Sequence, residues 1–273
     1  MKLKIMPLIE SQRGKLFYRD FRKQLQDQVP LLLVHGAGAS YMDWPVQLRR
    51  HPEAQVITPD LSGHGDSPGS GHDHIGAYVE DLLALMDALE IEKAIVGGHS
   101  MGGAIAQTMA LNAPDRVVGL LLVATGAHLP VNPLILDGLQ TDTEATVRRI
   151  IRWSWAKSFS DEWLAEVPLK RLLTVDPTVT RNDYAACAAF DVREQLGSIQ
   201  APTLIVAGEV DKMTPLAHSE VLAAGIPDAD LVVIEGGGHM LALEQPEIFT
   251  KHVIAWLRRL RSPGHQPGHQ NES

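Results

Sequence analysis

A series of short, almost continuous apolar runs is the feature that most limits the folds open to this chain. Such runs are typical of strands buried on both faces of a parallel sheet, and segments with helical spacing, for example around Leu82 and Trp256, lie between them. The strand candidates are residues 31–35, 55–58, 94–97, 118–124, 203–207 and 231–234. Because strands alternate with helices, we predict right-handed crossovers and an α/β fold with a doubly wound, mostly parallel central sheet flanked by helices.

The ends and the middle of the chain depart from this alternation. Residues 4–10 and 16–21 flank a turn that contains Gly14, so we expect a β-hairpin there. From about residue 128 to 197, helical patterns and aromatic residues occur without good strand candidates, and the stretch is too long for an ordinary connection. We predict an inserted helical cap, with a separate small domain unrelated to any site as the alternative. The predicted units are residues 1–127 and 198–261 for the core, 128–197 for the cap and 262–273 for a disordered tail.

Charge and cysteine content exclude several classes of function. The 273 residues include 24 Lys and Arg against 33 Asp and Glu, for a formal net charge of −9. This balance argues against a nucleic-acid partner, which requires clustered positive charge. No run reaches the ~18 apolar residues of a membrane span, and no secretory signal pattern is present, so we expect a cytoplasmic protein. Cys187 is the single cysteine, so no internal disulfide can form.

The segment Gly98-His99-Ser100-Met101-Gly102-Gly103 carries the sharpest chemical signal. It follows a predicted strand and opens a predicted helix, the setting in which a Gly-x-Ser-x-Gly pattern is meaningful. The small neighbours allow a tight turn with strained backbone angles, which lifts the serine hydroxyl clear of the sheet. The N–H groups at the helix start would face a developing oxyanion. Ser100 is therefore the candidate nucleophile.

A serine hydroxyl needs a base, and later segments offer one together with an acid. Asp211 follows the predicted strand 203–207, and His239 follows the predicted strand 231–234. Catalytic groups of open α/β sheets gather at the carboxyl ends of the strands. We expect His239 to take the Ser100 proton and Asp211 to fix the histidine tautomer. Glu209, the competing carboxylate, is expected to lie on the surface.

A loop of small residues, 35–40, follows the predicted strand 31–35. Such a loop lets a backbone N–H approach a substrate carbonyl. An oxyanion hole requires one N–H from this loop and one from the residue after the nucleophile. We assign Ala37 and Met101, with Gly36 or Gly38 as alternatives to Ala37.

Taken together, these motifs resemble the α/β-hydrolase superfamily, in its serine carboxylesterase and lipase-like branch. The resemblance runs from about residue 15 to 260 and adds further matches to the segments above. Residues 60–67 resemble the family's Asp-x-x-Gly-x-Gly-x-Ser loop, and Gly238-His239 is followed by Glu244-Gln245-Pro246-Glu247. We expect Glu244 to support the start of the last helix. The resemblance implies an α/β-hydrolase fold, and the chain order Ser, Asp, His is the one this fold uses.

The resemblance also narrows the activity. Dehalogenases and epoxide hydrolases of this fold carry Asp where this chain has Ser100, and carbon–carbon bond hydrolases usually carry Asn where it has His99. The menaquinone-pathway lyases usually carry an Arg where it has Ala104. We predict a hydrolase of carboxylic esters that forms an acyl-enzyme and uses no metal or organic cofactor. The alternatives are a carbon–carbon bond hydrolase or lactonase, a non-catalytic small-molecule receptor, and a metal-dependent hydrolase built on residues 64–74.

The substrate pocket is predicted from the cap. Trp153 and Trp155, with Phe159 and Trp163 nearby, could line an apolar pocket for small to medium apolar esters, although packing within the cap is the alternative. Gly36 and His99 are further candidates for substrate contact, His99 also being a candidate for structural packing. The sequence does not predict the physiological ester or the oligomeric state.

Overall fold

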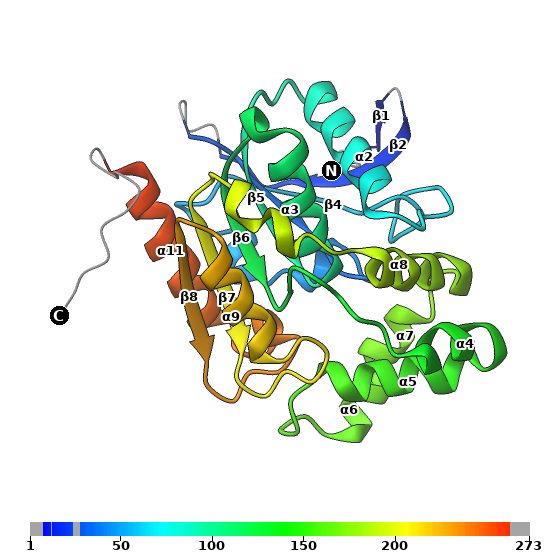
Figure 1. Cartoon of the computed structure of the whole chain (residues 1–273). Coiled ribbons are helices and arrows are strands. Elements are labelled where there is room, and N and C mark those ends of the chain that lie inside the picture. Colours follow the sequence, from blue (N-terminus) through cyan, green and yellow to red (C-terminus); the bar gives the residue numbers. More distant parts are fainter. Residues whose placement is uncertain (1–7, 12, 24–27, 263–273) are drawn as a thin grey trace, which may run out of the picture.

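A single twisted sheet forms the centre of the molecule in the computed structural model, which describes residues 8–11, 13–23 and 28–262 (Figure 1). Within these residues the strand order is β1-β2-β4-β3-β5-β6-β7-β8, and all pairs from β4 to β8 are parallel. The strands are β1 (Leu8–Ser11), β2 (Gly14–Asp20), β3 (Leu31–Val34), β4 (Val56–Pro59), β5 (Ala94–His99), β6 (Val117–Val123), β7 (Thr203–Gly208) and β8 (Ala229–Ile234). The predicted mostly parallel α/β sheet is confirmed.

The predicted N-terminal hairpin is present at one edge of this sheet. Strands β1 and β2 pair in an antiparallel manner, with Ile9 opposite Leu16. Gly14 has a φ of 123°, which side-chain-bearing residues rarely adopt, so glycine allows the chain to reverse there. Strand β2 then pairs with β4 and joins the hairpin to the parallel sheet. The first residues of the predicted hairpin, 4–7, lie outside the described residues.

Helices cover both faces of the sheet. The helices of the described residues are α1 (Val46–Arg49), α2 (Ile75–Ala88), α3 (Met101–Asn112), α4 (Pro133–Thr141), α5 (Thr143–Ser154), α6 (Asp161–Glu166), α7 (Pro168–Leu172), α8 (Pro177–Ala189), α9 (Leu216–Gly225), α10 (Leu241–Glu244) and α11 (Pro246–Arg261), with short 3-10 helices at Tyr41–Asp43, Pro114–Arg116 and Arg193–Ser198. Helices α2, α3 and α9 belong to the hydrophobic cluster on one face, and α1 and α11 to the cluster on the other. No helix of the described part of the chain is both long and apolar enough to cross a membrane.

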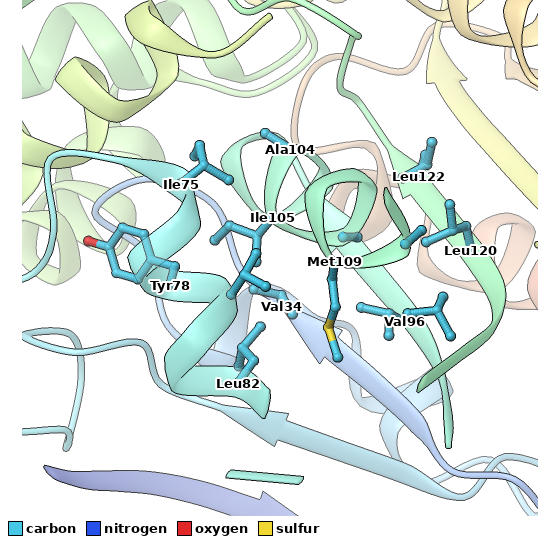
Figure 2. Close-up of a cluster of buried hydrophobic side chains, with 14 of the residues drawn as sticks. Val34, Ile75, Tyr78, Leu82, Val96, Ala104, Ile105, Met109, Leu120 and Leu122 are labelled. Carbon is cyan, nitrogen blue, oxygen red and sulfur yellow. The ribbon is translucent and has the colours of Figure 1, made fainter. Parts of the chain in front are cut away.

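The alternation of side chains along each strand divides the core into layers. Val34 packs against α2 and α3, in the cluster that contains Leu82 and Ile105 (Figure 2). Leu33, the preceding residue of β3, faces the other side, where Phe249 of α11 lies in a second cluster. Because the strands are buried on both faces, their sequences are almost continuously apolar.

Helices α4 to α8, here called the inserted helices, fall between β6 and β7 and gather at one end of the molecule (Figure 1). They contain a hydrophobic cluster of their own, which includes Ile150, Trp155 and Leu164. The division of the chain into core and cap at residues 128 and 197 stays a prediction. The predicted tail lies outside the described residues from 263 onward.

Candidate active site

Ser100 occupies a strained turn between β5 and α3. Its φ and ψ are 53° and −117°, a backbone conformation that is energetically unfavourable for a residue with a side chain. The neighbouring glycines permit this turn: a Cβ on Gly98 would lie 2.0 Å from the carbonyl oxygen of Gly102. A Cβ on Gly102 would in turn lie 2.3 Å from the carbonyl oxygen of Val34. The backbone therefore holds Ser100 against β3 in the strained geometry that the sequence predicts.

Asp211 and His239 follow β7 and β8, and their side chains meet. Nδ1 of His239 lies 2.9 Å from Oδ2 of Asp211, and both residues are buried. Because the carboxylate only accepts, Nδ1 is the protonated nitrogen and Nε2 of the neutral ring carries a lone pair. Thr214 donates its hydroxyl to the same carboxylate oxygen at 2.7 Å, and the N–H groups of Met213 and Thr214 donate to Oδ1 at 2.8 and 3.0 Å.

These contacts keep Asp211 ionised. Burial by itself raises the pKa of this carboxyl, but the charge and hydrogen bond of His239, together with the bonds from Thr214, outweigh burial. The pKa of Asp211 is therefore lowered below its ordinary value. An ionised carboxylate in this position fixes the tautomer of His239 and favours its protonated form during proton transfer.

Ser100 and His239 line the same cavity, which has a volume of about 300 Å³. His99 also lines it; its ring lies 4.8 Å from that of His239 between centroids, and its Nε2 donates to the His239 carbonyl oxygen at 2.9 Å. Burial, followed by the nearby His239, lowers the pKa of His99 to about 3. His99 is therefore neutral near pH 7 and helps to position the backbone of His239.

The loop after β3 lies directly against Ser100. A Cβ on Gly36 would be 3.3 Å from the Ser100 Cβ, so glycine allows the close approach of this backbone. Gly36 and Ala37 both line the cavity. The N–H of Gly38 instead donates to Oδ2 of Asp183 at 2.8 Å. Gly38 as an alternative oxyanion donor is therefore wrong, because its N–H is already bonded to a buried carboxylate.

The aromatic residues of the inserted helices line two neighbouring cavities. Trp155, Phe159 and Trp163 line the cavity of Ser100, and the ring centroid of Trp155 lies 4.8 Å from each of the other two. Trp153 lines a different cavity, beside Lys212. The expectation that Trp153 contacts substrate stays a prediction, since this second cavity shares Tyr184 and Met213 with the cavity of Ser100.

Glu244 has a different position from the one expected. Its Oε2 accepts from the Gly238 N–H at 2.6 Å, and its Oε1 accepts from the Ala156 N–H at 3.0 Å. Helix α11 begins at Pro246 without a side-chain cap. Glu244 therefore ties the loop of His239 to the inserted helices, and its expected support of the last helix is wrong. No local sequence pattern signals this contact, because Ala156 is 88 residues away.

The cavity wall also contains a charged pair that was not predicted from the sequence. Arg171 of α7 and Asp43 both line the cavity, and their side chains are 2.6 Å apart. Burial raises the pKa of Asp43, although the charge and hydrogen bond of Arg171 act in the opposite direction. Nothing in the sequence pairs these residues, which lie 128 positions apart.

Other residues singled out in the sequence serve local structure. Asp60 accepts from the N–H groups of Tyr41 and Asp66 at 2.7 and 3.0 Å, which closes the loop of residues 60–67. Glu209 accepts from the Gly236 N–H at the surface.

Among residues 8–11, 13–23 and 28–262, no group of three or more His, Cys, Asp or Glu side chains could hold a metal ion.

Comparison with known proteins identifies the family to which this fold belongs. A model of the "Alpha/beta hydrolase family" matches residues 31–251, which include strands β3 to β8, the Ser100 turn and the Asp211 and His239 loops. The chain belongs to the α/β hydrolase family. The fold expected from the resemblance is thereby confirmed.

Relatives within this family differ in their described activities. The dihydrolipoyllysine-residue acetyltransferase component of an acetoin cleaving system from Pseudomonas putida is 34% identical, over 92% of this chain and 69% of that protein. A putative carbamate hydrolase from Azorhizobium caulinodans is 32% identical, over 83% and 90%. A solved thermophilic esterase from Thermogutta terrifontis is 28% identical with a TM-score of 0.80, over 94% of this chain and 99% of that one. The α/β hydrolase scaffold is shared, whereas the substrate varies.

Proposed function

We propose that this protein hydrolyses carboxylic esters through Ser100, His239 and Asp211. The observation that carries the proposal is the buried Asp211–His239 hydrogen bond of 2.9 Å behind a cavity that both Ser100 and His239 line. A strained serine, a histidine with a free Nε2 lone pair and an ionised carboxylate are the components of nucleophilic acyl transfer. The similarity to the Thermogutta esterase supports the choice of esters.

In the first half of the reaction, Nε2 of His239 takes the Ser100 proton as Oγ attacks the ester carbonyl. The carbonyl π electrons move to oxygen, and the N–H groups of Met101 and Ala37 hold the resulting oxyanion. Collapse of this intermediate breaks the bond to the alcohol oxygen, which takes the proton from His239. Asp211 stabilises the imidazolium throughout, and the acyl group remains on Ser100.

In the second half, water replaces the alcohol. His239 takes a proton from water as the water oxygen attacks the acyl carbonyl, and the oxyanion forms again between Ala37 and Met101. Collapse breaks the bond to Ser100 Oγ, which takes the proton back from His239. The products are a carboxylic acid and an alcohol, and no cofactor takes part in either step.

The cavity walls favour neutral, apolar acyl groups of small to medium size. Trp155, Phe159 and Ile151 contribute apolar surface, and a volume of about 300 Å³ accommodates a short acyl chain. Arg171 and Asp43 neutralise one another, so their net charge does not favour an anionic substrate. We therefore propose esters with short aliphatic or small aromatic acyl groups.

Kinetics with p-nitrophenyl esters of graded chain length test this proposal. We expect Ser100→Ala and His239→Ala to lose nearly all turnover, and Asp211→Asn to lose about 10⁴-fold because the wrong tautomer forms. His72→Ala is the matched histidine control, since His72 pairs with Asp81 and does not line the cavity. Wild-type activity in Ser100→Ala would overturn the proposal.

The same assay separates the alternatives. A lactone, a ring-cleavage dienone and a carbamate are tested beside the simple esters, because these substrates use the same attack of serine on a carbonyl. A higher kcat/KM on one of them than on every ester would replace esters as the substrate class while retaining Ser100. A receptor, by contrast, would turn over none of them.

A further inference from the structure

Asp183 is a buried carboxylate that joins the inserted helices to distant parts of the core. It lies on α8, and its side chain has no exposed surface. Its Oδ2 accepts hydrogen bonds from the Gly38 N–H at 2.8 Å and from Nε2 of His64 at 2.7 Å. Its Oδ1 accepts from the Tyr78 hydroxyl at 2.5 Å. The carboxylate thus contacts the loops after β3 and β4 and helix α2 at once.

The hydrogen bonds and the raised pKa of the partner His64 favour its positively charged form. Its Nδ1 lies 3.0 Å from the carbonyl oxygen of Ser62, and its Nε2 faces Asp183. Both partners can only accept, so both ring nitrogens must carry protons. Burial alone lowers the pKa of His64, but the charge and hydrogen bond of Asp183 and the Ser62 carbonyl outweigh it, so the pKa is raised. Asp183 therefore belongs to a fully buried ion pair.

The bonds around Ala37 fix the peptide planes on both of its sides. The N–H of Leu61 donates to Nε2 of His35 at 3.0 Å, so Nδ1 of His35 is protonated and donates to the Gly36 carbonyl at 2.8 Å. This carbonyl shares a rigid plane with the Ala37 N–H. The following plane contains the Gly38 N–H, which Asp183 holds. Rotation of Ala37 would break one of these bonds.

We propose that Asp183 is a positioning residue that orients residues 35–40, the oxyanion loop, for the reaction at Ser100. The inference rests on the proposed function, because it assigns the Ala37 N–H to the oxyanion. It also makes the inserted helices part of the catalytic geometry, since Asp183 reaches the loop from α8. A merely structural Asp183 would stabilise the fold without affecting how well the site binds a tetrahedral oxyanion.

The variant Asp183→Leu separates these roles. Leucine has a similar volume but no hydrogen-bond acceptor, so the Gly38 N–H loses its bond together with those of His64 and Tyr78. We expect kcat on a p-nitrophenyl ester to fall at least about tenfold, with KM changed less than about threefold, because an oxyanion donor acts mainly in the transition state. The affinity for phenylboronic acid, which forms a tetrahedral adduct with a reactive serine, should fall in parallel with kcat.

Tyr78→Phe provides the matched control. It removes one donor to Asp183 but leaves the Gly38 and His64 bonds in place. We expect this variant to unfold at a lower temperature, with kcat and boronate affinity close to the wild type. If Asp183→Leu shows the same pattern, with lower stability and unchanged kcat and boronate affinity, Asp183 is structural only and the proposal is overturned.

Amide hydrogen exchange supplies a readout that does not depend on activity. In Asp183→Leu the Gly38 N–H should exchange at least tenfold faster than in the wild type, and equal exchange would overturn the proposal. If the variant does not fold, the exchange rates are compared within the wild-type protein. The Gly38 N–H must then exchange far more slowly than the N–H of the exposed Gly69, and similar rates would overturn the proposal. If the wild-type protein shows no activity that depends on Ser100, the proposed function is overturned. The exchange rate of the Gly38 N–H then tests only whether Asp183 holds this N–H.

Discussion

The strained backbone at Ser100 predicts that this turn lowers the stability of the fold while it places the serine hydroxyl for activity. Its φ of 53° and ψ of −117° are costly for any residue with a Cβ, by about 1–3 kcal/mol, whereas glycine adopts them without strain. Glycine loses more backbone entropy on folding, by about 0.5–1 kcal/mol. The difference makes Ser100→Gly more stable than Ser100→Ala by about 1 kcal/mol, although both variants lack the hydroxyl and should be inactive.

Urea and thermal unfolding of the paired variants measure this difference. We expect the melting temperature of Ser100→Gly to exceed that of Ser100→Ala by about 2–4 °C. Ala113→Gly is the matched control, because Ala113 caps the other end of α3 with an ordinary φ of −139°. Removing its Cβ relieves no strain and should lower stability by about 0.5–1 kcal/mol. If Ser100→Gly is no more stable than Ser100→Ala, the turn stores no strain and the reasoning is refuted.

Further predictions concern the cavity, a buried histidine and a bridging carboxylate. Trp155→Ala should shift the ester preference towards longer acyl chains by about tenfold in relative kcat/KM, whereas Trp153→Ala should not, and identical profiles would contradict the cavity assignment. Because the pKa of His99 is about 3 in the folded protein against 6.5 unfolded, its stabilising contribution is present above pH 6.5 and is lost as the pH falls towards 3. The stability of wild type relative to His99→Asn should therefore drop by about 2 kcal/mol between pH 6.5 and 5, as measured by urea unfolding, and a constant difference would refute the shift. Glu244→Gln can no longer accept from both its backbone partners, one of them Gly238, and should lower the free energy of unfolding by about 1–3 kcal/mol and reduce kcat. Unchanged kcat and stability would contradict the bridging role.

The sequence predicted the fold and the positions of Ser100, Asp211 and His239 because their signals are local. Each of these residues lies within five residues after the end of a strand, and the carboxyl ends of parallel strands lie at one edge of the sheet. The strain at Ser100 was likewise predictable, because it depends on small residues within a few positions. The assignment of these three residues to catalysis still stays a prediction until it is tested by mutation.

What the sequence did not predict depends on the packing of the inserted helices. The bond between Asp183 and Gly38 joins residues 145 positions apart, and no periodicity brings them together. Trp153 and Trp155 give a related example: aromatic content indicates an apolar wall, but the packing of the inserted helices decides which cavity each ring lines. Likewise, the role of Glu244 depends on how the inserted helices meet the loop of His239.

The most direct test of the central claim is to map the residue that a fluorophosphonate probe modifies. The wild-type protein is treated with the probe, digested and analysed by mass spectrometry, with Ser100→Ala and His239→Ala treated in parallel. The account predicts a single adduct on Ser100 in the wild type, none in Ser100→Ala and strongly slowed labelling in His239→Ala. Labelling at another residue, or an unreactive wild-type Ser100, would contradict it.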